Sequence, residues 1–119
     1  MGASSLVTDE ILIGLAMRLK PIFERYRVLR AIAFGSLARG EGTRRSDLDL
    51  LIIQHTTERF LDRYGELFRE IVQEVSERDV DMLIYTPEEI EQLADRPFIA
   101  KVLKEGKILY ESHKEPASS

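Results

Sequence analysis

The sequence predicts an α/β (α+β) fold: one small mixed β-sheet of three to four strands flanked by helices. Three observations lead to this expectation. Apolar runs at 28–34, 48–54 and 79–85 have the length and composition of buried strands. Amphipathic helical patterns precede, separate and follow these runs. A last short segment, 107–111, has the character of an edge strand.

Composition fits a globular protein. At 119 residues and 44% hydrophobic content, the chain has the size of one domain, expected at 1–112, before a polar, disordered tail at 113–119. The net charge of −4, with both signs interspersed, disfavours direct nucleic-acid binding. Without cysteine, disulfides and thiolate zinc sites are excluded. No apolar run reaches the roughly 18 residues of a membrane span, and no secretory signal appears, so we expect a cytoplasmic protein without membrane contact.

The first helix is expected to begin at Thr8, where a hydroxyl cap is followed by two acidic residues. Its apolar residues fall on one stripe, which predicts packing against a core. These residues are Leu12, Leu15, Ala16, Leu19 and Phe23. Proline disrupts helix interiors, so we expect Pro21 to kink the helix or to end it near Lys20.

The connections predict the strand directions. The loop between the first two strands is too short for a parallel crossover, so these strands are expected to be antiparallel neighbours. A long helix opening at Thr57 and containing Gly65 is expected to lead to the third strand, which then lies parallel to the second. Its apolar positions keep helical spacing over five turns. These are Phe60, Tyr64, Leu67, Phe68, Ile71 and Val75.

Two short helices are predicted after the third strand. Thr86 and Glu89 have the spacing of a capping box, with a proline between them at the first helical position. This helix is expected to end near Leu93. A second helix opens at Pro97 and ends at Gly106.

Most of the candidate functional residues lie in the stretch 35–53. Gly35 and Ser36 follow the first strand directly, and Leu37 to Arg39 predicts a single helical turn. A glycine at a strand end lets backbone N–H groups approach a phosphate, a serine hydroxyl adds a donor, and a helical turn adds a favourable dipole. The alternative is a plain turn. Neither a Walker loop nor a dinucleotide-binding glycine motif is present.

Four aspartates stand at the starts of the second and third strands. Residues two apart on a strand share a face, so Asp47 projects with Asp49, and Asp79 with Asp81. Carboxylates about 5 Å apart repel by roughly 3 kcal/mol at an effective dielectric of 20. A cluster of this kind protonates or binds cations, and oxygen ligands favour Mg²⁺ or Mn²⁺. The alternative is that these acids are solvated strand ends or partners of Arg44 and Arg45.

Gly35-Ser36, ten intervening residues and Asp47-x-Asp49 resemble the signature of the polymerase-β-like nucleotidyltransferase superfamily. The fuller strings Gly-Ser-x-Ala-Arg-Gly and Ser-Asp-x-Asp-Leu are similar to its minimal nucleotidyltransferase (MNT) branch, of the MntA-like antitoxin type. The resemblance implies the polymerase-β-like fold, a nucleoside triphosphate held by Gly35 and Ser36, and two Mg²⁺ ions on Asp47, Asp49 and a third carboxylate.

The strand context of the third family carboxylate matches Asp81 better than Asp79, so the resemblance implies that Asp81 binds the metal that activates the attacking hydroxyl. Arg39 and Arg45 are candidate phosphate ligands, with a solubilising surface role as the alternative. The role of Arg44 stays open.

The resemblance also implies a partner. Larger members of the superfamily present the acceptor on an additional domain, for which this sequence leaves no room. In the minimal branch the implied partner is a helical HEPN ribonuclease toxin, and AMP is transferred from ATP to its tyrosine. Two alternatives remain: a module that neutralises the HEPN protein by occlusion, and an antibiotic nucleotidyltransferase. Self-association into a homo-oligomer is also open.

Overall fold

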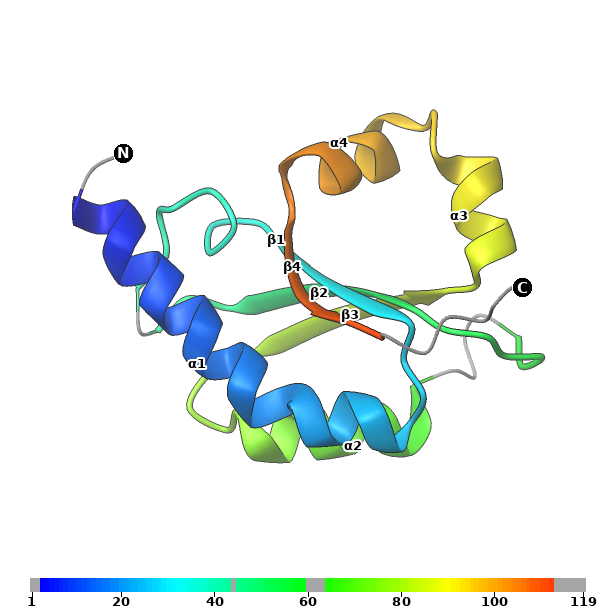
Figure 1. The fold of residues 1–119 in the computed structure, drawn as a ribbon, viewed down its shortest axis with the longest axis horizontal. Coiled ribbons are helices and arrows are strands. Elements are labelled where there is room, and N and C mark those ends of the chain that lie inside the picture. Colours follow the sequence, from blue (N-terminus) through cyan, green and yellow to red (C-terminus); the bar gives the residue numbers. More distant parts are fainter. Residues whose placement is uncertain (1–2, 44, 60–63, 113–119) are drawn as a thin grey trace.

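The computed structural model describes residues 3–43, 45–59 and 64–112 (Figure 1). Helices and strands account for most of these residues. In chain order they are α1 (Ala3–Arg25), β1 (Arg30–Phe34), β2 (Leu48–Ile53), α2 (Gly65–Glu74), β3 (Val80–Tyr85), α3 (Pro87–Leu93), α4 (Pro97–Glu105) and β4 (Lys107–Glu111).

The strands form one four-stranded mixed sheet in the order β3-β2-β1-β4. β1 runs antiparallel to both β2 and β4, and β2 runs parallel to β3. The predicted mixed sheet and its strand directions are confirmed. The directions follow from the connections, since a short loop joins β1 to β2 whereas α2 provides the crossover from β2 to β3.

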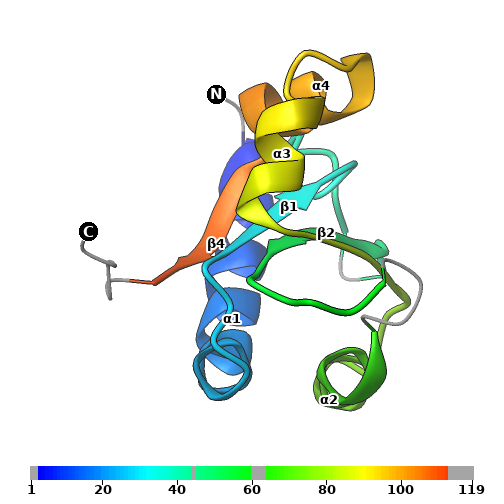
Figure 2. The same ribbon diagram turned by 90° about the vertical axis from the view of Figure 1, so that its right-hand side faces the viewer.

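Helices cover both faces of the sheet. α1 and α2 lie on one face, and α3 and α4 lie on the other (Figures 1 and 2). β2 is buried on both faces: Leu50 and Ile52 belong to the core beneath α1 and α2, and Leu51 and Ile53 pack in the core beneath α4. A strand covered on both faces must be apolar throughout, which explains the unbroken apolar run in the sequence. None of the described helices combines the length and the apolar composition needed to cross a membrane.

The first helix is longer than predicted. α1 begins at Ala3 rather than Thr8, and it continues through Pro21 to Arg25, so the prediction that the helix ends near Lys20 is wrong. Proline removes one intrahelical hydrogen bond, but Leu19 and Phe23, on either side of it, are fully buried. Burial of these side chains outweighs the lost bond.

The second helix is shorter than predicted. Residues 54–59 are not helical, and α2 begins at Gly65 instead of Thr57. Gly65 has a φ of 38°, which a helix interior does not adopt and which favours glycine. The glycine therefore marks the start of the helix and does not lie inside it. Leu67 and Ile71 are buried as expected, whereas Phe60 lies outside the described residues.

The last third of the chain follows the prediction. The Thr86 hydroxyl accepts a hydrogen bond from the Glu89 N–H at 3.1 Å, and the Thr86 N–H donates to the Glu89 carboxylate at 3.0 Å. This is the predicted capping box. β4 has the predicted bounds and lies at an edge of the sheet. The tail expected at 113–119 lies outside the described residues.

An ion-pair network joins α1 to the end of α2. The Arg18 guanidinium lies 2.7 Å from a Glu77 carboxylate oxygen and 3.3 Å from one of Glu74. The hydrogen bond from Arg18 lowers the pKa of Glu77 to about 2. Because the carboxylate is easier to ionise in the folded protein than in the unfolded chain, its charge stabilises the fold.

We predict that Arg18→Met lowers the free energy of unfolding by about 1 kcal/mol at neutral pH, since the network is partly exposed and screened by solvent. The folded pKa of Glu77 lies below its usual value of 4.5. The difference in the free energy of unfolding between variant and wild type is therefore largest above about pH 5, and it disappears as the pH falls toward 2. Urea unfolding over this range measures it. Arg69→Met, which removes an exposed pair within α2, is the control. A loss independent of pH would contradict the assignment to Glu77.

Candidate functional site

The predicted site lies at one end of the sheet, where β1 ends and β2 and β3 begin. Phe34, at the end of β1, is paired in register with Asp49 on β2, and Asp49 is paired with Asp81 on β3. These three residues form a row across the sheet. Leu51, two residues after Asp49, packs in the core beneath α4. The row therefore faces the α3 and α4 side.

Asp49 and Asp81 are brought together by this register, and their carboxyl groups interact. Burial raises the pKa of Asp49 to about 6, and the charge of Asp81, a hydrogen bond with Asp81 and the charge of Asp47 add to the shift. Arg39 acts in the opposite direction. The surrounding protein therefore leaves negative charge at Asp49 undercompensated, which is the condition under which a carboxylate pair protonates or takes up a cation.

Asp47 directly precedes β2. β2 begins at Leu48, as the sequence predicts, and Asp47 is the last residue of the loop before it. Asp47 is exposed, although its charge still reaches Asp49. Within 3–43, 45–59 and 64–112, no three acidic or histidine side chains lie close enough to hold a metal ion. The fold brings Asp49 and Asp81 together, and Asp47 lies next to them on a loop.

The two candidates for the third carboxylate differ in position. Asp81 lies inside β3, directly beside Asp49. Asp79 precedes β3, and its backbone carbonyl accepts a hydrogen bond from the Leu48 N–H at 2.8 Å. The geometry therefore favours Asp81 as the partner of Asp49, and leaves Asp79 a backbone role at the start of the parallel pair.

The turn after β1 approaches Asp49 closely. Gly35 has a φ of 78°, a left-handed conformation that favours glycine, and a Cβ at this position would collide with the Asp49 carboxylate. The Arg39 N–H donates to the Gly35 carbonyl at 3.1 Å, which closes the single helical turn that the sequence predicts. The Gly35 backbone thus lies beside Asp49, and Ser36 follows it in the turn.

The two candidate arginines do not share one environment. Arg39 forms an ion pair with Glu41 at 3.2 Å, and its charge acts on Asp49. Arg45 is exposed, and its backbone N–H donates to the Thr43 hydroxyl at 3.2 Å. The structure brings Arg39 to the carboxylates, while Arg45 lies on the loop before Asp47. Arg44 is outside the described residues.

Arg78 holds the loop in place, a role that the sequence did not reveal. Its side chain is 5% exposed, and its Nη1 donates to the Ser46 carbonyl at 2.7 Å, next to Asp47. Its Nε is buried without a hydrogen-bond partner in the described part of the chain, 3.8 Å from a Glu77 oxygen. The sequence around Arg78 contains no signal that distinguishes it from a surface arginine. Its contact with the loop before Asp47 becomes visible only in the fold.

The carboxylates suit a divalent cation in charge and ligand type. Mg²⁺ prefers oxygen ligands and is commonly held by one or two carboxylates together with substrate phosphates. Asp49 and Asp81 supply two neighbouring carboxylates, and Gly35 brings the backbone of the turn to them. The donor set therefore fits a cation shared between protein and a phosphate-bearing ligand.

We predict that Asp49→Asn raises the free energy of unfolding of the metal-free protein by about 1 kcal/mol at pH 7, because it removes a partly buried charge in a solvent-screened site. The folded pKa of about 6 lies above the usual 3.8. The wild type therefore loses stability as the pH rises from about 4 to 6, and the variant's advantage appears over that range. Urea unfolding in EDTA measures the effect. The exposed Asp95→Asn is the matched control, and equal behaviour of the two variants would contradict the prediction.

We predict that Arg78→Met lowers the free energy of unfolding by about 1–3 kcal/mol, because the Ser46 carbonyl loses a charged donor. Amide hydrogen exchange at Asp47 and Leu48 should become faster. Arg78→Lys keeps the charge and should lose less. If Arg78→Met is as stable as the wild type, with unchanged exchange at these amides, the guanidinium does not hold the loop.

Comparisons with known proteins agree with this geometry. The sequence model of the family described as "Polymerase beta, Nucleotidyltransferase" matches residues 17–115. A comparison with curated proteins finds no match.

Three solved structures are similar in fold. A toxin–antitoxin with AMP-PNP is 20% identical, with a TM-score of 0.57 over 82% of this chain and 74% of that chain. A putative nucleotidyltransferase from Sulfolobus solfataricus is 19% identical, with a TM-score of 0.59 over 96% of this chain and 93% of that chain. A mutant of the toxin–antitoxin MntA-HpeT is 17% identical, with a TM-score of 0.56 over 82% and 74%.

At these identities the structural likeness establishes a shared fold. The family is shown by the sequence model, which matches most of the chain. The turn at Gly35 and the paired carboxylates Asp49 and Asp81 lie within the matched residues. The chain belongs to the polymerase β nucleotidyltransferase family.

Proposed function

We propose that this protein transfers a nucleoside monophosphate, AMP from ATP, to a hydroxyl group of a partner protein in a Mg²⁺-dependent reaction, and that the partner is a helical toxin of the HEPN class. The observation that carries the proposal is the register that sets Asp81 beside Asp49, next to the Gly35 turn. This arrangement supports the proposal, because carboxylates beside the turn suit a metal ion shared with a phosphate bound there.

The chain's own residues have distinct roles in this proposal. Gly35 and Ser36 bind the phosphates through backbone N–H groups and a hydroxyl, and Arg39 neutralises their charge. Asp47, Asp49 and Asp81 would hold two Mg²⁺ ions, with Mn²⁺ as a substitute. When bound, these ions polarise the α-phosphate and lower the pKa of the attacking hydroxyl. The hydroxyl oxygen forms a bond to the α-phosphorus, the bond to the bridging oxygen breaks, and pyrophosphate and a proton leave.

The exposure of the acids supports a large acceptor. Asp81 is exposed, and it lies on β3, which is an edge strand of the sheet. Figure 2 shows α3 and α4 together on one face of the sheet, and α4 packs against β1, which β2 separates from β3. A hydroxyl on the surface of another protein can therefore approach from the β3 side, while the nucleotide occupies the side of Gly35.

The structural neighbours support the choice of partner. Two of them are toxin–antitoxin structures, and one of these contains AMP-PNP. The other carries two Asp-to-Glu substitutions two residues apart, which is the spacing of Asp47 and Asp49 in this chain. Nucleotide binding and a toxin partner are properties of those proteins, and we extend them to this chain as part of the proposal.

Incubation with ATP labelled on the α-phosphate, Mg²⁺ and a helical HEPN-class protein tests the proposal. We predict that the partner becomes labelled, and that Asp47→Asn and Asp49→Asn each reduce labelling by at least about 100-fold because metal-held charge stabilisation is lost. ATP labelled on the γ-phosphate should give no label, since the pyrophosphate leaves. Asp95→Asn is the control variant. If the folded wild type binds ATP but does not label the helical protein, transfer to that partner is overturned.

Toxin neutralisation separates transfer from simple occlusion. A variant carrying Asp47→Ala and Asp49→Ala should bind the partner but fail to relieve its toxicity if transfer is the mechanism. Full neutralisation by this variant would favour the occlusion alternative. Labelling of an aminoglycoside or another small hydroxyl compound in place of the partner would favour the antibiotic alternative.

A further inference from the structure

We propose that the pocket between α4 and the end of β1 binds the base of the nucleoside triphosphate. This inference rests on the proposed function and assigns one part of the nucleotide to a place that the catalytic motif does not define. The residues that carry it are Phe34, Phe98 and Lys101, which lie outside that motif.

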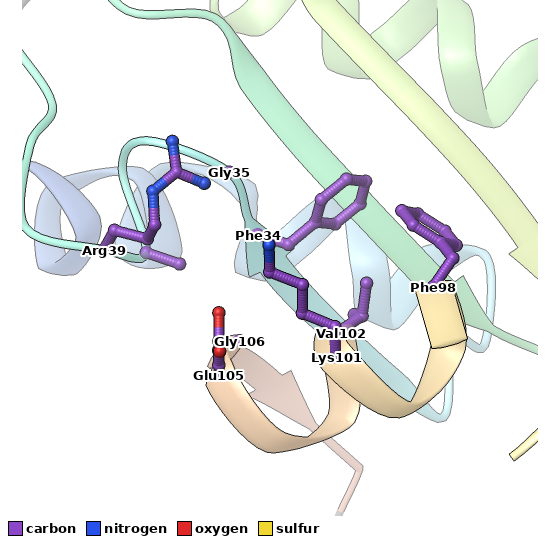
Figure 3. A pocket seen from close by; sticks show the side chains of 9 residues that line it. Phe34, Gly35, Arg39, Phe98, Lys101, Val102, Glu105 and Gly106 are labelled. Atoms are coloured by element: carbon purple, nitrogen blue, oxygen red, sulfur yellow. The ribbon is translucent and has the colours of Figure 1, made fainter. Parts of the chain in front are cut away.

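The pocket has an apolar wall and a charged rim. Phe34 and Phe98 form the wall, with ring centroids 5.5 Å apart and planes at 84°. Figure 3 shows Arg39 at one end of the pocket and Phe98 at the other, with the Lys101 side chain between them and Glu105 below. An apolar wall with a few charged groups at its edge suits a flat ring that carries polar atoms on its edge.

Phe98 is unusual for an aromatic residue on a packed helix. It lies in the first turn of α4 and is 47% exposed, whereas Ile99 and Val102 of the same helix are buried in the core. Its ring is therefore not needed to fill the core, and it leaves an aromatic surface open at the mouth of the pocket. Stacking on an exposed aromatic ring is a common way to bind bases without reading their sequence.

The pocket adjoins the residues that we assign to the phosphates. Gly35 and Arg39, which we assign to the phosphates, also line the pocket. Phe34 is paired in register with Asp49 and is the residue before Gly35. Asp81 lies on the opposite side of Asp49 from Phe34. A base bound in this pocket therefore lies on the Gly35 side of the carboxylates. The β3 side stays open to the acceptor.

The size of the pocket distinguishes a ring from a larger group. Its volume is about 160 Å³, and apolar cavities of about 150 Å³ hold a single benzene ring. A whole nucleotide does not fit, so the sugar and the phosphates extend out along the Gly35 turn. The pyrophosphate end is strongly hydrated and highly charged, and the apolar wall of Phe34 and Phe98 disfavours it. The base is the part of the nucleotide that matches.

Binding of ATP and of inorganic tripolyphosphate, each with Mg²⁺, tests the assignment by calorimetry. Tripolyphosphate carries the phosphates without a base. We predict that Phe98→Ala weakens ATP binding by about tenfold, as is typical when an aromatic ring is removed from a base, and leaves tripolyphosphate binding within about twofold. Phe98→Tyr should retain ATP affinity. Leu103→Ala, on the same helix and 39% exposed, is the matched control, and because Phe98 is half-exposed its variants should stay folded.

The outcomes separate this inference from the proposed function. If the wild type binds neither ligand, both are overturned. If the wild type binds ATP and Phe98→Ala has no effect, or weakens ATP and tripolyphosphate equally, the pocket is not the base site and the proposed function stands. If Phe98→Ala leaves ATP binding intact but reduces transfer to the partner, the pocket contacts the acceptor and the base assignment is wrong.

Discussion

The parallel pairing of β2 with β3 is the constraint on which the site depends, because it sets Asp81 directly beside Asp49. The two carboxyl groups lie side by side, although burial and then the charge of Asp81 raise the pKa of Asp49. They can be held together only because β2 is fixed by burial on both faces, with Leu50 toward α1 and α2 and Leu51 toward α4. The apolar core thus supports an arrangement that the acids alone would avoid.

Most of the fold was predictable because the strands are marked by apolar runs, and their directions by the length of the connections between them. The helix ends were less predictable. Pro21 suggested a break that the buried Leu19 and Phe23 override, and Gly65 looked like a helix interior residue although its φ makes it a helix start. In each case a local preference competed with packing or with a backbone conformation that no sequence pattern displays.

The site was predictable in its residue types and only partly in its geometry. Gly35, Asp49 and Asp81 lie together as the motif and the alternation of side chains suggest. Asp47 directly precedes β2, which begins at Leu48 as predicted, and its charge acts on Asp49 from the adjoining loop. Arg78 was not visible at all, since its bond to the Ser46 carbonyl joins segments far apart in the sequence.

The mixed topology also orders the way in which the site is assembled during folding. β1 and β2 are joined by a short loop, so their antiparallel pair, with the Gly35 turn at its end, closes at small entropic cost. The pairing of Asp49 with Asp81 must wait until the chain has crossed over through α2. The lower sequence separation therefore favours formation of the turn before the acid pair. In the proposed function, nucleotide binding therefore needs the β2–β3 pairing as well as the β1–β2 pair.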